Sequence, residues 1–463
     1  MAKSALRRLS VALRLTEAYQ PVQSTAMTTE ANSLRSFLSK SKESYLRDVK
    51  EDQEKAAAHW TVVMGNEAGD LDSIASSIAF AWVQSEVNKK PAVPVMQVER
   101  DDLSLRAENL HALKMAGLSD TLDELLTLTE LHQFKPFPAH KFALVDHNRL
   151  GDTFTEDNPK AEVVAILDHH QDEGLYPSAV PRVIAPCGSC ASHVAAVCAG
   201  EIPPELATLL LTAIIIDTDG FRPGGKAVQV DRDAALSLTH RCTVSHLIPP
   251  PSALSPIENP NANPDALYEV PAIKELSKTL ADKKSDVSHL GALDLLRRDY
   301  KEYSYKLSWA TGQPTVKAGL STVPTSLKAW ATDGRLEKAA VEWMERHDLT
   351  ILGVLTSFRD VKKPVVGKAK QGKHKREMAW IILEKPPLAK SANDGLTSEA
   401  LARRIWQGLE ADKEIDVKPF KKFTLEKSSN LPQNSKARLY KQGNAHATRK
   451  TTAPLLKKIL ESS

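Results

Sequence analysis

Short apolar runs that alternate with helical patterns dominate the first half of this 463-residue chain. The five runs, each rich in β-branched residues, are 61–64, 92–96, 142–145, 163–167 and 212–216. Continuous apolar strands separated by helices are typical of a parallel sheet that is buried on both faces. The helices expected around these runs are 33–58, 73–86, with Ser73 as its N-cap, 105–116, 192–198 and 204–211. We therefore predict an α/β fold built on a parallel sheet.

The second half of the chain predicts a second, smaller α/β domain. A segment rich in proline and asparagine, 249–270, is expected to link the two domains. We expect the first domain to span 33–248 and the second 271–463, which is within the usual domain size.

In the second domain, the pattern predicts helices over 273–280 and 289–309 and strands over 349–357 and 378–384. A stretch rich in lysine and glycine, 361–376, is expected to join the two strands as a hairpin-like loop.

Composition excludes several classes of protein. No apolar run approaches the roughly 18 residues of a membrane-spanning helix, so we expect no membrane partner. The 61 basic and 58 acidic side chains leave a formal charge of only +3, and we expect no nucleic-acid partner and a monomer. Four cysteines do not make a disulfide scaffold, which favours a reducing, cytoplasmic location.

Basic residues are nevertheless concentrated in two places and at the N-terminus. The clusters at 362–376 and 436–458 suit a polyanionic ligand, although a solvated basic surface is the commoner explanation of any single cluster. No acid precedes Glu17, whereas four basic residues do. Segment 1–32 is therefore either a flexible extension or a transit peptide, and the second alternative would imply a mitochondrial location.

Acidic side chains follow four of the five apolar runs directly. They are Asp70 and Asp72 after the first run, Asp146 after the third, Asp168 with His169 and His170 after the fourth, and Asp217 after the fifth. The carboxyl ends of strands in an open parallel sheet line one crevice, where ligands bind. A lone aspartate after a strand is most often a turn or cap residue, but four such positions in one domain favour a shared site.

Carboxylates gathered in one crevice repel each other, so a cation must offset them. Carboxylates with a few imidazoles suit Mg²⁺ or Mn²⁺. The number of carboxylates predicts two divalent ions that share a bridging ligand. Such a pair lowers the pKa of a bound water and stabilises the attacking and leaving oxygens of phosphoryl displacement.

These residues resemble the motifs of the DHH phosphoesterase superfamily. The matching segments are Gly65-Asn66-Glu67 with Asp70, Asp72 and Ser73, then Asp146-His147-Asn148, then Asp168-His169-His170, then 188–192, then Asp217-Thr218. The C-terminal part resembles the DHHA2 accessory domain, with the similarity carried by 297–302 and 448–450. The ensemble is most similar to fungal-type exopolyphosphatases, relatives of the family II inorganic pyrophosphatases, from about residue 59 onward.

The resemblance implies a role for each site residue. Asp70 and Asp146 would hold one ion, and Asp72, Asp146, His169 and Asp217 the other, with Asn66 as a weak ligand. His170 would contact a substrate phosphate, and Asp168 would orient the neighbouring imidazole. Lys301, Arg449 and Lys450 match the cations with which the accessory domain grips phosphate.

The activity implied is hydrolysis of the terminal phosphoanhydride bond of inorganic polyphosphate. Asn66 stands where the pyrophosphatase branch has a histidine, which should lessen selectivity for Mn²⁺ over Mg²⁺. His170 stands where Prune-like proteins tend to lose the histidine, which favours a working exopolyphosphatase. The alternatives are an inorganic pyrophosphatase, a Prune-like phosphodiesterase and a non-catalytic scaffold that binds polyphosphate.

Overall fold

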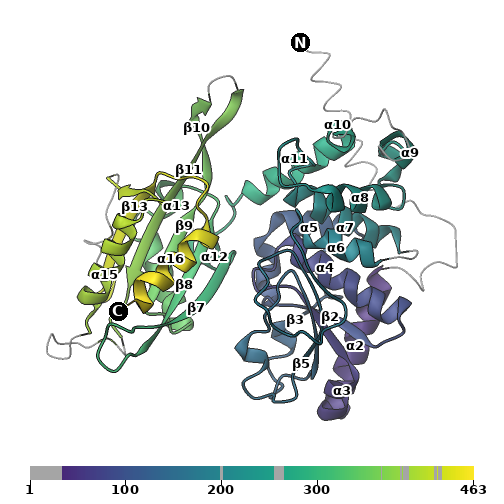
Figure 1. Ribbon diagram of the computed structural model, residues 1–463, viewed down its shortest axis with the longest axis horizontal. Helices are drawn as coiled ribbons and strands as arrows, with labels where there is room; N and C mark the ends of the chain where they lie inside the picture. Colours follow the sequence, from purple (N-terminus) through teal and green to yellow (C-terminus); the bar gives the residue numbers. More distant parts are fainter. Residues whose placement is uncertain are drawn as a thin grey trace. The chain divides into compact units, whose positions relative to one another are not determined.

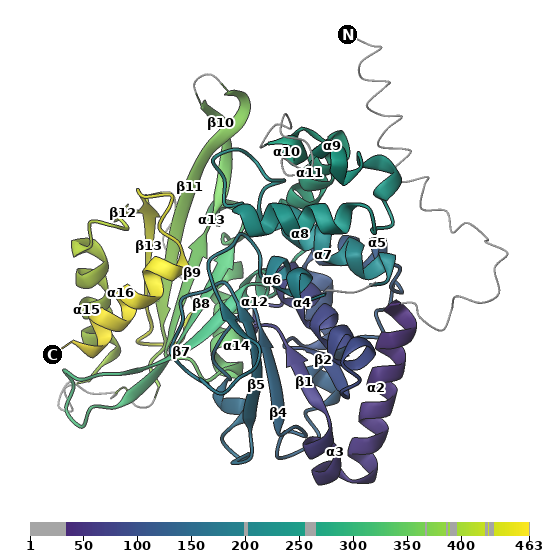
Figure 2. The same ribbon diagram turned by 45° about the vertical axis from the view of Figure 1, so that its right-hand side comes forward.

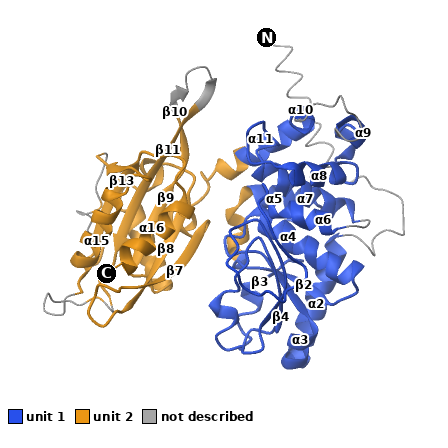
Figure 3. Cartoon of the chain, viewed as in Figure 1, with its two compact units in different colours: residues 1–100, 108–281 blue, residues 101–107, 282–463 orange. Residues whose placement is uncertain are grey.

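The computed structural model describes residues 34–198, 202–254, 265–365, 368–385, 388, 396–421, 425 and 430–462. The N-terminal segment 1–32 and residues 255–264 of the expected linker lie outside the described residues. The chain divides into two units: unit 1 comprises 1–100 and 108–281, and unit 2 comprises 101–107 and 282–463 (Figure 3). No helix among the described residues is both long and apolar enough to cross a membrane.

Unit 1 is built on a six-stranded sheet whose paired strands all run parallel (Figure 1). In spatial order the strands are β3 (Leu126–Thr127), β2 (Ala92–Met96), β1 (Thr61–Met64), β4 (Lys141–Val145), β5 (Glu162–Asp168) and β6 (Arg182–Ile184). The order reverses between β1 and β4, and such a switch point is where ligands bind in open α/β sheets. Four of the five predicted strands are confirmed.

Helices cover both faces of this sheet, as the alternating pattern predicts, with α2, α4 and α6 in contact with its strands. The helices of unit 1 are α2 (Leu34–Glu51), α3 (Gln53–His59), α4 (Leu71–Trp82), α5 (Ala107–Met115), α6 (Cys190–Val197), α7 (Pro204–Asp217), α8 (Gln229–Thr239), α9 (Pro251–Leu254), α10 (Ala266–Glu269) and α11 (Pro271–Ser285), which crosses the unit boundary. Tyr45 and Trp60, from α2 and the end of α3, pack with alternate residues of β1, β2 and β4 in one core. The helix α4 packs against β1, β2, α6 and α7, as Figure 2 shows.

The fifth apolar run is a helix and not a strand, so the prediction for 212–216 was wrong. The run belongs to α7, which begins with Pro204 at its first turn and continues to Asp217. Because α7 packs against α4, α6 and α8, it is apolar on nearly all sides, and its periodicity resembles that of a buried strand. The cap of α4 also differs from the prediction: Asp70, not Ser73, is the N-cap, and its side chain accepts from the Ser73 N–H.

Unit 2 contains a seven-stranded mixed sheet. Its strands in spatial order are β12 (Val417–Pro419), β13 (Lys436–Gln442), β11 (Lys368–Ile382), β9 (Ile351–Thr356), β8 (Thr315–Val323) and β7 (Tyr300–Lys306), with β10 (Phe358–Val365) paired to β11. The pair β8–β9 is parallel and the other pairs are antiparallel. The predicted strands at 349–357 and 378–384 are confirmed as β9 and part of β11.

Two hydrophobic cores form on the two faces of this sheet. The helices of the unit are α12 (Ala292–Arg297), α13 (Leu327–Trp330), α14 (Arg335–Arg346), α15 (Ser398–Ala411) and α16 (Arg449–Glu461). Trp380 of β11 packs with residues of α15 and α16, whereas its neighbours Ala379 and Ile381 pack with residues of α12 and α14. This alternation places one helix layer on each face of the sheet.

The predicted helix 289–309 was also wrong beyond its first turns. Only α12 is helical, and β7 follows it at the edge of the sheet. Tyr303 and Tyr305 alternate with polar residues along β7, and their rings stack 6.0 Å apart. Alternation with period two and aromatic residues favour a strand with one buried face.

Candidate metal centre

The predicted site residues of unit 1 meet at the carboxyl ends of the parallel strands. Asn66 follows β1 and Asp146 follows β4, the two strands at which the sheet order reverses. The Asn66 amide donates to both the backbone oxygen of Asp146 (3.0 Å) and its Oδ2 (2.8 Å). The Asn66 Oδ1 accepts from the Ala68 N–H, so Asn66 contributes a donor to Asp146 and its oxygen is engaged elsewhere. This arrangement fits positioning of Asp146 better than the weak ligation expected from the sequence.

The two oxygens of Asp146 have different surroundings. Its Oδ2 accepts from the Ser73 hydroxyl at 2.6 Å as well as from Asn66. Its Oδ1 faces two imidazoles, at 3.3 Å from His169 Nε2 and 3.7 Å from His170 Nδ1. Asp146, His169 and His170 form a group whose ligand atoms all lie within 4.8 Å of one another. One carboxylate oxygen is thus held by the protein while the other points into the group.

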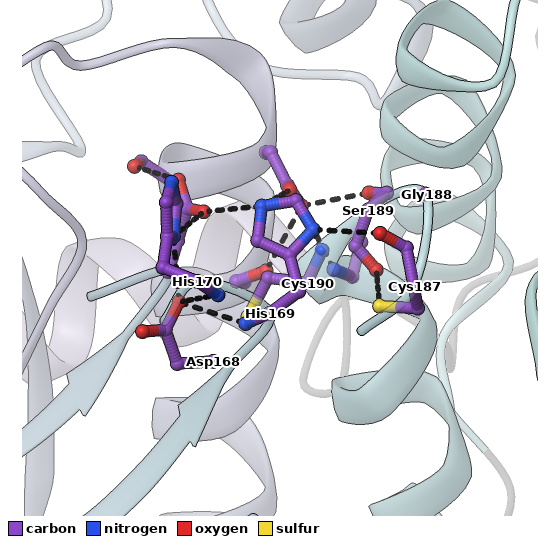
Figure 4. Close-up of polar contacts among 12 residues, drawn as sticks. Asp168, His169, His170, Cys187, Gly188, Ser189 and Cys190 are labelled. Carbon is purple, nitrogen blue, oxygen red and sulfur yellow. Dashed lines mark hydrogen bonds and ion pairs between the residues drawn. The ribbon is translucent and has the colours of Figure 1, made fainter. Parts of the chain in front are cut away.

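The two histidines are each fixed through one ring nitrogen (Figure 4). His169 Nδ1 lies 3.1 Å from the carbonyl oxygen of Cys187, so this nitrogen carries the proton that it donates. His169 Nε2 faces Asp146 Oδ1 and would offer its lone pair to a cation once its own proton has left. His170 Nδ1 lies 2.8 Å from Asp168 Oδ1, which leaves the opposite nitrogen of His170 free of that contact.

Asp168 is fully buried and connects these groups to the strand β5. Its Oδ1 accepts from the backbone N–H of His169 (2.8 Å) and of His170 (3.2 Å), and its Oδ2 accepts from the Asn148 amide. Burial alone would raise the pKa of Asp168, but the hydrogen bonds and charge of His170 and the Asn148 amide lower it to about 2. A carboxylate that orients an imidazole from behind is typical of metal-binding histidines.

Asp72 lies in the first turn of α4 and meets the N-terminus of α6. Its Oδ1 accepts from the Ser189 hydroxyl and the Ala191 N–H, both at 2.8 Å, and its Oδ2 accepts from the Cys190 N–H at 2.7 Å. The Oδ2 also lies 4.0 Å from His169 Nε2. Free N–H groups at a helix start favour an anion, which explains how a carboxylate that is 2% exposed is accommodated here.

Asp231 in α8 holds the same helix start from the other side, and sequence reasoning missed it. This fully buried carboxylate accepts from the backbone N–H of Gly188 (2.8 Å) and from the hydroxyl of Ser192 (2.6 Å). A side chain at Gly188 would place its Cβ 2.6 Å from Thr218 and 2.9 Å from Asp231, so the close approach requires glycine. The local sequence of α8 holds no signal for this role, because the contact partners lie some forty residues away.

The remaining acids lie close enough to Asp72 for their charges to act on it. Burial raises the pKa of Asp72 well above its usual value, and the negative charges of Asp146, Asp217 and Asp70 raise it further. Asp217 therefore reaches the site from the end of the helix α7, although it does not follow a strand. The structure thus places Asp72, Asp146, His169 and His170 side by side, and the charges of Asp70 and Asp217 act on Asp72.

The same negative field acts on His169. Burial would lower its pKa, but hydrogen bonds to the side chains of Asp146 and Cys187 and the charge of Asp72 raise the pKa of His169 to about 11. A site that holds a proton this strongly would exchange it for a divalent cation, because the donors are carboxylate oxygens and an imidazole nitrogen. The donor set therefore fits Mg²⁺ or Mn²⁺.

The three predicted cations lie in unit 2. Arg449 Nη2 lies 2.9 Å from Asp299 Oδ1, and its Nη1 donates to the Asp299 carbonyl at 3.1 Å. Lys450 is exposed in the first turn of α16, and Lys301 is half-buried on β7. Arg449 is thus committed to an ion pair within its own unit.

Comparison with known families agrees with this geometry. Residues 60–214 match the family model described as "DHH family, N-terminal domain", and residues 278–459 match the DHHA2 domain. The chain therefore belongs to the proteins that join a DHH domain to a DHHA2 domain.

Individual relatives carry related names. The chain is 28% identical over 324 residues, 66% of its length and 75% of the relative, to a "Putative exopolyphosphatase" of Schizosaccharomyces pombe. It is 30% identical over 271 residues to "Exopolyphosphatase PRUNE1" of Rattus norvegicus, which covers 56% of this chain and 52% of that protein. It is also 29% identical over 190 residues, 39% of this chain and 55% of the relative, to a "Probable manganese-dependent inorganic pyrophosphatase" of Archaeoglobus fulgidus.

Proposed function

We propose that this protein is an exopolyphosphatase that hydrolyses the terminal phosphoanhydride bond of inorganic polyphosphate and releases orthophosphate. The observation that carries the proposal is the convergence of Asp72, Asp146 and His169 at the strand ends of unit 1, each fixed by buried hydrogen bonds. The names of the relatives support the substrate class.

Two divalent cations, Mg²⁺ or Mn²⁺, would be held by Asp70, Asp72, Asp146, His169 and Asp217. When bound, these ions would lower the pKa of a water molecule and offset the charge of the substrate. The protein orients two of these ligands by holding the atom that faces away from the group: the Ser73 hydroxyl donates to Asp146 Oδ2, and His169 Nδ1 donates to the Cys187 carbonyl.

His170 would serve the substrate. Asp168 accepts a hydrogen bond from Nδ1 of His170 and so fixes the imidazole ring. The Nε2 atom of His170 can then donate a hydrogen bond to a phosphate oxygen or a proton to the leaving oxygen. The His170 side chain is 31% exposed, twice as much as that of His169, which fits a residue that meets substrate. Lys301 and Lys450 stay predicted phosphate contacts.

The decisive experiment is a substrate panel. Orthophosphate release is measured from pyrophosphate, tripolyphosphate and long-chain polyphosphate, each with Mg²⁺ and with Mn²⁺, and with the Asp146→Ala variant as the blank. We expect release from tripolyphosphate and longer chains to exceed release from pyrophosphate, with both metals supporting it.

Each alternative has its own outcome. Preference for pyrophosphate would make the protein a pyrophosphatase. A nucleotide diester is assayed beside the panel for formation of the monoester, and hydrolysis of this substrate alone would make the protein a phosphodiesterase. If orthophosphate release from every substrate is no faster than with the Asp146→Ala blank, the remaining alternative is a non-catalytic scaffold that binds polyphosphate. Any of these results overturns the proposal.

A further inference from the structure

The hairpin of β10 and β11 in unit 2 is strongly basic and is not part of the site described above. Residues 358–376 contain eight lysine and arginine side chains and one acid, Asp360. The two strands pair antiparallel, with Arg359 opposite His374 and Asp360 opposite Lys373. The side chains of residues 361–371 lie outside the described residues, so the argument uses only the base of the hairpin.

The register sorts the charges of the base onto two faces. Directly opposite residues share a face, and residues two apart on a strand also share one. Arg359, His374 and Arg376 therefore lie on one face. Lys373 and Lys375 lie on the other, together with Asp360, which forms an ion pair with Lys375.

The first face is cationic and has no acidic partner among the described residues. Neither Arg359 nor Arg376 forms an ion pair there, and Arg376 Nε donates to the Ala445 carbonyl at 2.7 Å. His374 Nε2 lies 2.9 Å from the Ser357 hydroxyl. Burial and then the positive charges of Arg376, Arg359 and His446 lower the pKa of His374, which shows that these groups lie close enough to repel one another.

We propose that the face formed by Arg359, His374, Arg376 and His446 binds a segment of the polyphosphate chain away from the bond that is cleaved. Cations held together without an acid create a positive potential that a polyanion relieves, and a guanidinium matches phosphate oxygens with two parallel donors. The proposal rests on the proposed function and adds a subsite to it.

The composition of the hairpin favours a phosphate chain over a nucleic acid. Single-stranded nucleic acids bind through aromatic platforms as well as charge. The one Phe, Tyr or Trp residue within 358–376 is Phe358, which pairs opposite Lys375 and so lies on the other face. The face thus offers charge and hydrogen-bond donors without a Phe, Tyr or Trp ring from the hairpin.

The test compares two variants that remove the same charge from opposite faces of one hairpin. Arg359→Gln removes a cation from the proposed face, and Lys373→Gln is the matched control. KM is measured for long-chain polyphosphate and for tripolyphosphate at low and at moderate salt. Binding of long-chain polyphosphate is measured separately in EDTA, so that the readout does not require turnover.

We expect Arg359→Gln to raise KM for the long chain, relative to tripolyphosphate, about 3–10-fold and to weaken its salt dependence. Lys373→Gln should match the wild type in this ratio, and binding in EDTA should weaken only with Arg359→Gln. Equal effects of the two variants, or none, would overturn the subsite. Displacement of the chain by an equal phosphate concentration of RNA would overturn the choice of ligand.

The outcome is distinguishable from failure of the proposed function. If the wild type releases no orthophosphate from tripolyphosphate, the proposed function fails whatever the hairpin does. The subsite fails on its own when tripolyphosphate is hydrolysed but long chains bind the two variants alike.

Discussion

Two groups of carboxylates in unit 1 are surrounded in opposite ways. Glu130 accepts from Lys42 Nζ at 2.9 Å and forms an ion pair with Arg100, and although burial acts to raise its pKa, these contacts and the Thr127 hydroxyl lower it to about 2. Burial and neighbouring acids instead raise the pKa of Asp72 well above its usual value. Glu130 is neutralised by a lysine and an arginine, whereas the charge of His169 does not offset the burial of Asp72 and its neighbouring acids.

The acids of the candidate metal centre are held in place by hydrogen bonds that leave their negative charge uncancelled. The hydrogen bonds on Asp72 and Asp146 come from backbone N–H groups, hydroxyls and an amide, which orient a carboxylate without cancelling its charge. Among the described groups, the nearest cationic candidates are the imidazoles of His169 and His170. The protein therefore orders these acids for a cation that comes from solution.

The largest expected effect follows from removing the central acid. Asp146→Ala should lower orthophosphate release at least roughly 10³-fold, more than the loss of an orienting group causes, because Asp146 faces both histidines. The control is Asp157→Ala, which removes an exposed acid of the same unit. Circular dichroism should show that both variants fold. An active Asp146→Ala enzyme would mean that the acids of this cluster are not ligands.

A variant of Asp231 tests whether the hydrogen bonds that hold the start of α6 affect metal binding through Asp72. Asp231→Asn turns one of the two carboxylate oxygens into an NH2 donor, so either Gly188 or Ser192 loses its acceptor and the start of α6 should hold Asp72 less well. We expect Mn²⁺ affinity, measured by calorimetry, to fall about 10–100-fold, with activity largely restored at high metal concentration.

Asp233→Asn on the same helix is the matched control, since Asp233 is exposed and accepts from Gln229. Unchanged metal affinity in folded Asp231→Asn protein would show that the contacts of Asp231 are structural only.

Variants of Arg449 and Lys450 distinguish an ion pair that stabilises the fold from a side chain that contacts substrate. Arg449→Gln leaves Asp299 without its closest cation, and we expect a loss of about 2 kcal/mol in the free energy of unfolding, because the pair is largely shielded from solvent. Lys450→Gln removes an exposed cation and should change KM for polyphosphate with little change in stability. Urea denaturation and steady-state kinetics on both variants measure the two effects. Equal stability of the variants would contradict this division.

The sequence predicted much of unit 1 because its central strands are apolar on both faces. The same criterion gave a wrong prediction at 212–216, because a helix surrounded by other helices is equally apolar. The charge of Asp217, at the end of α7, nevertheless acts on Asp72. The orienting role of Asp231 depends on contacts between distant segments, which no local pattern carries. In unit 2, β7 was taken for a helix because an edge strand with polar alternate residues has too few apolar positions to settle its period.

An effect of about the same size concerns Glu130 and its dependence on pH. A pKa that is lower in the folded than in the unfolded protein stabilises the fold above the unfolded value, near 4.5, and this stabilisation is lost as the pH falls toward about 2. Between pH 7 and pH 3 the wild type should therefore lose about 2 kcal/mol more than Glu130→Gln in the free energy of unfolding. Urea denaturation at both pH values gives the difference, with Glu156→Gln, an exposed acid of unit 1, as the control. A Glu130→Gln protein that loses as much stability in acid as the wild type would show that Lys42 and Arg100 do not neutralise Glu130, and the contrast with Asp72 would then rest on burial alone.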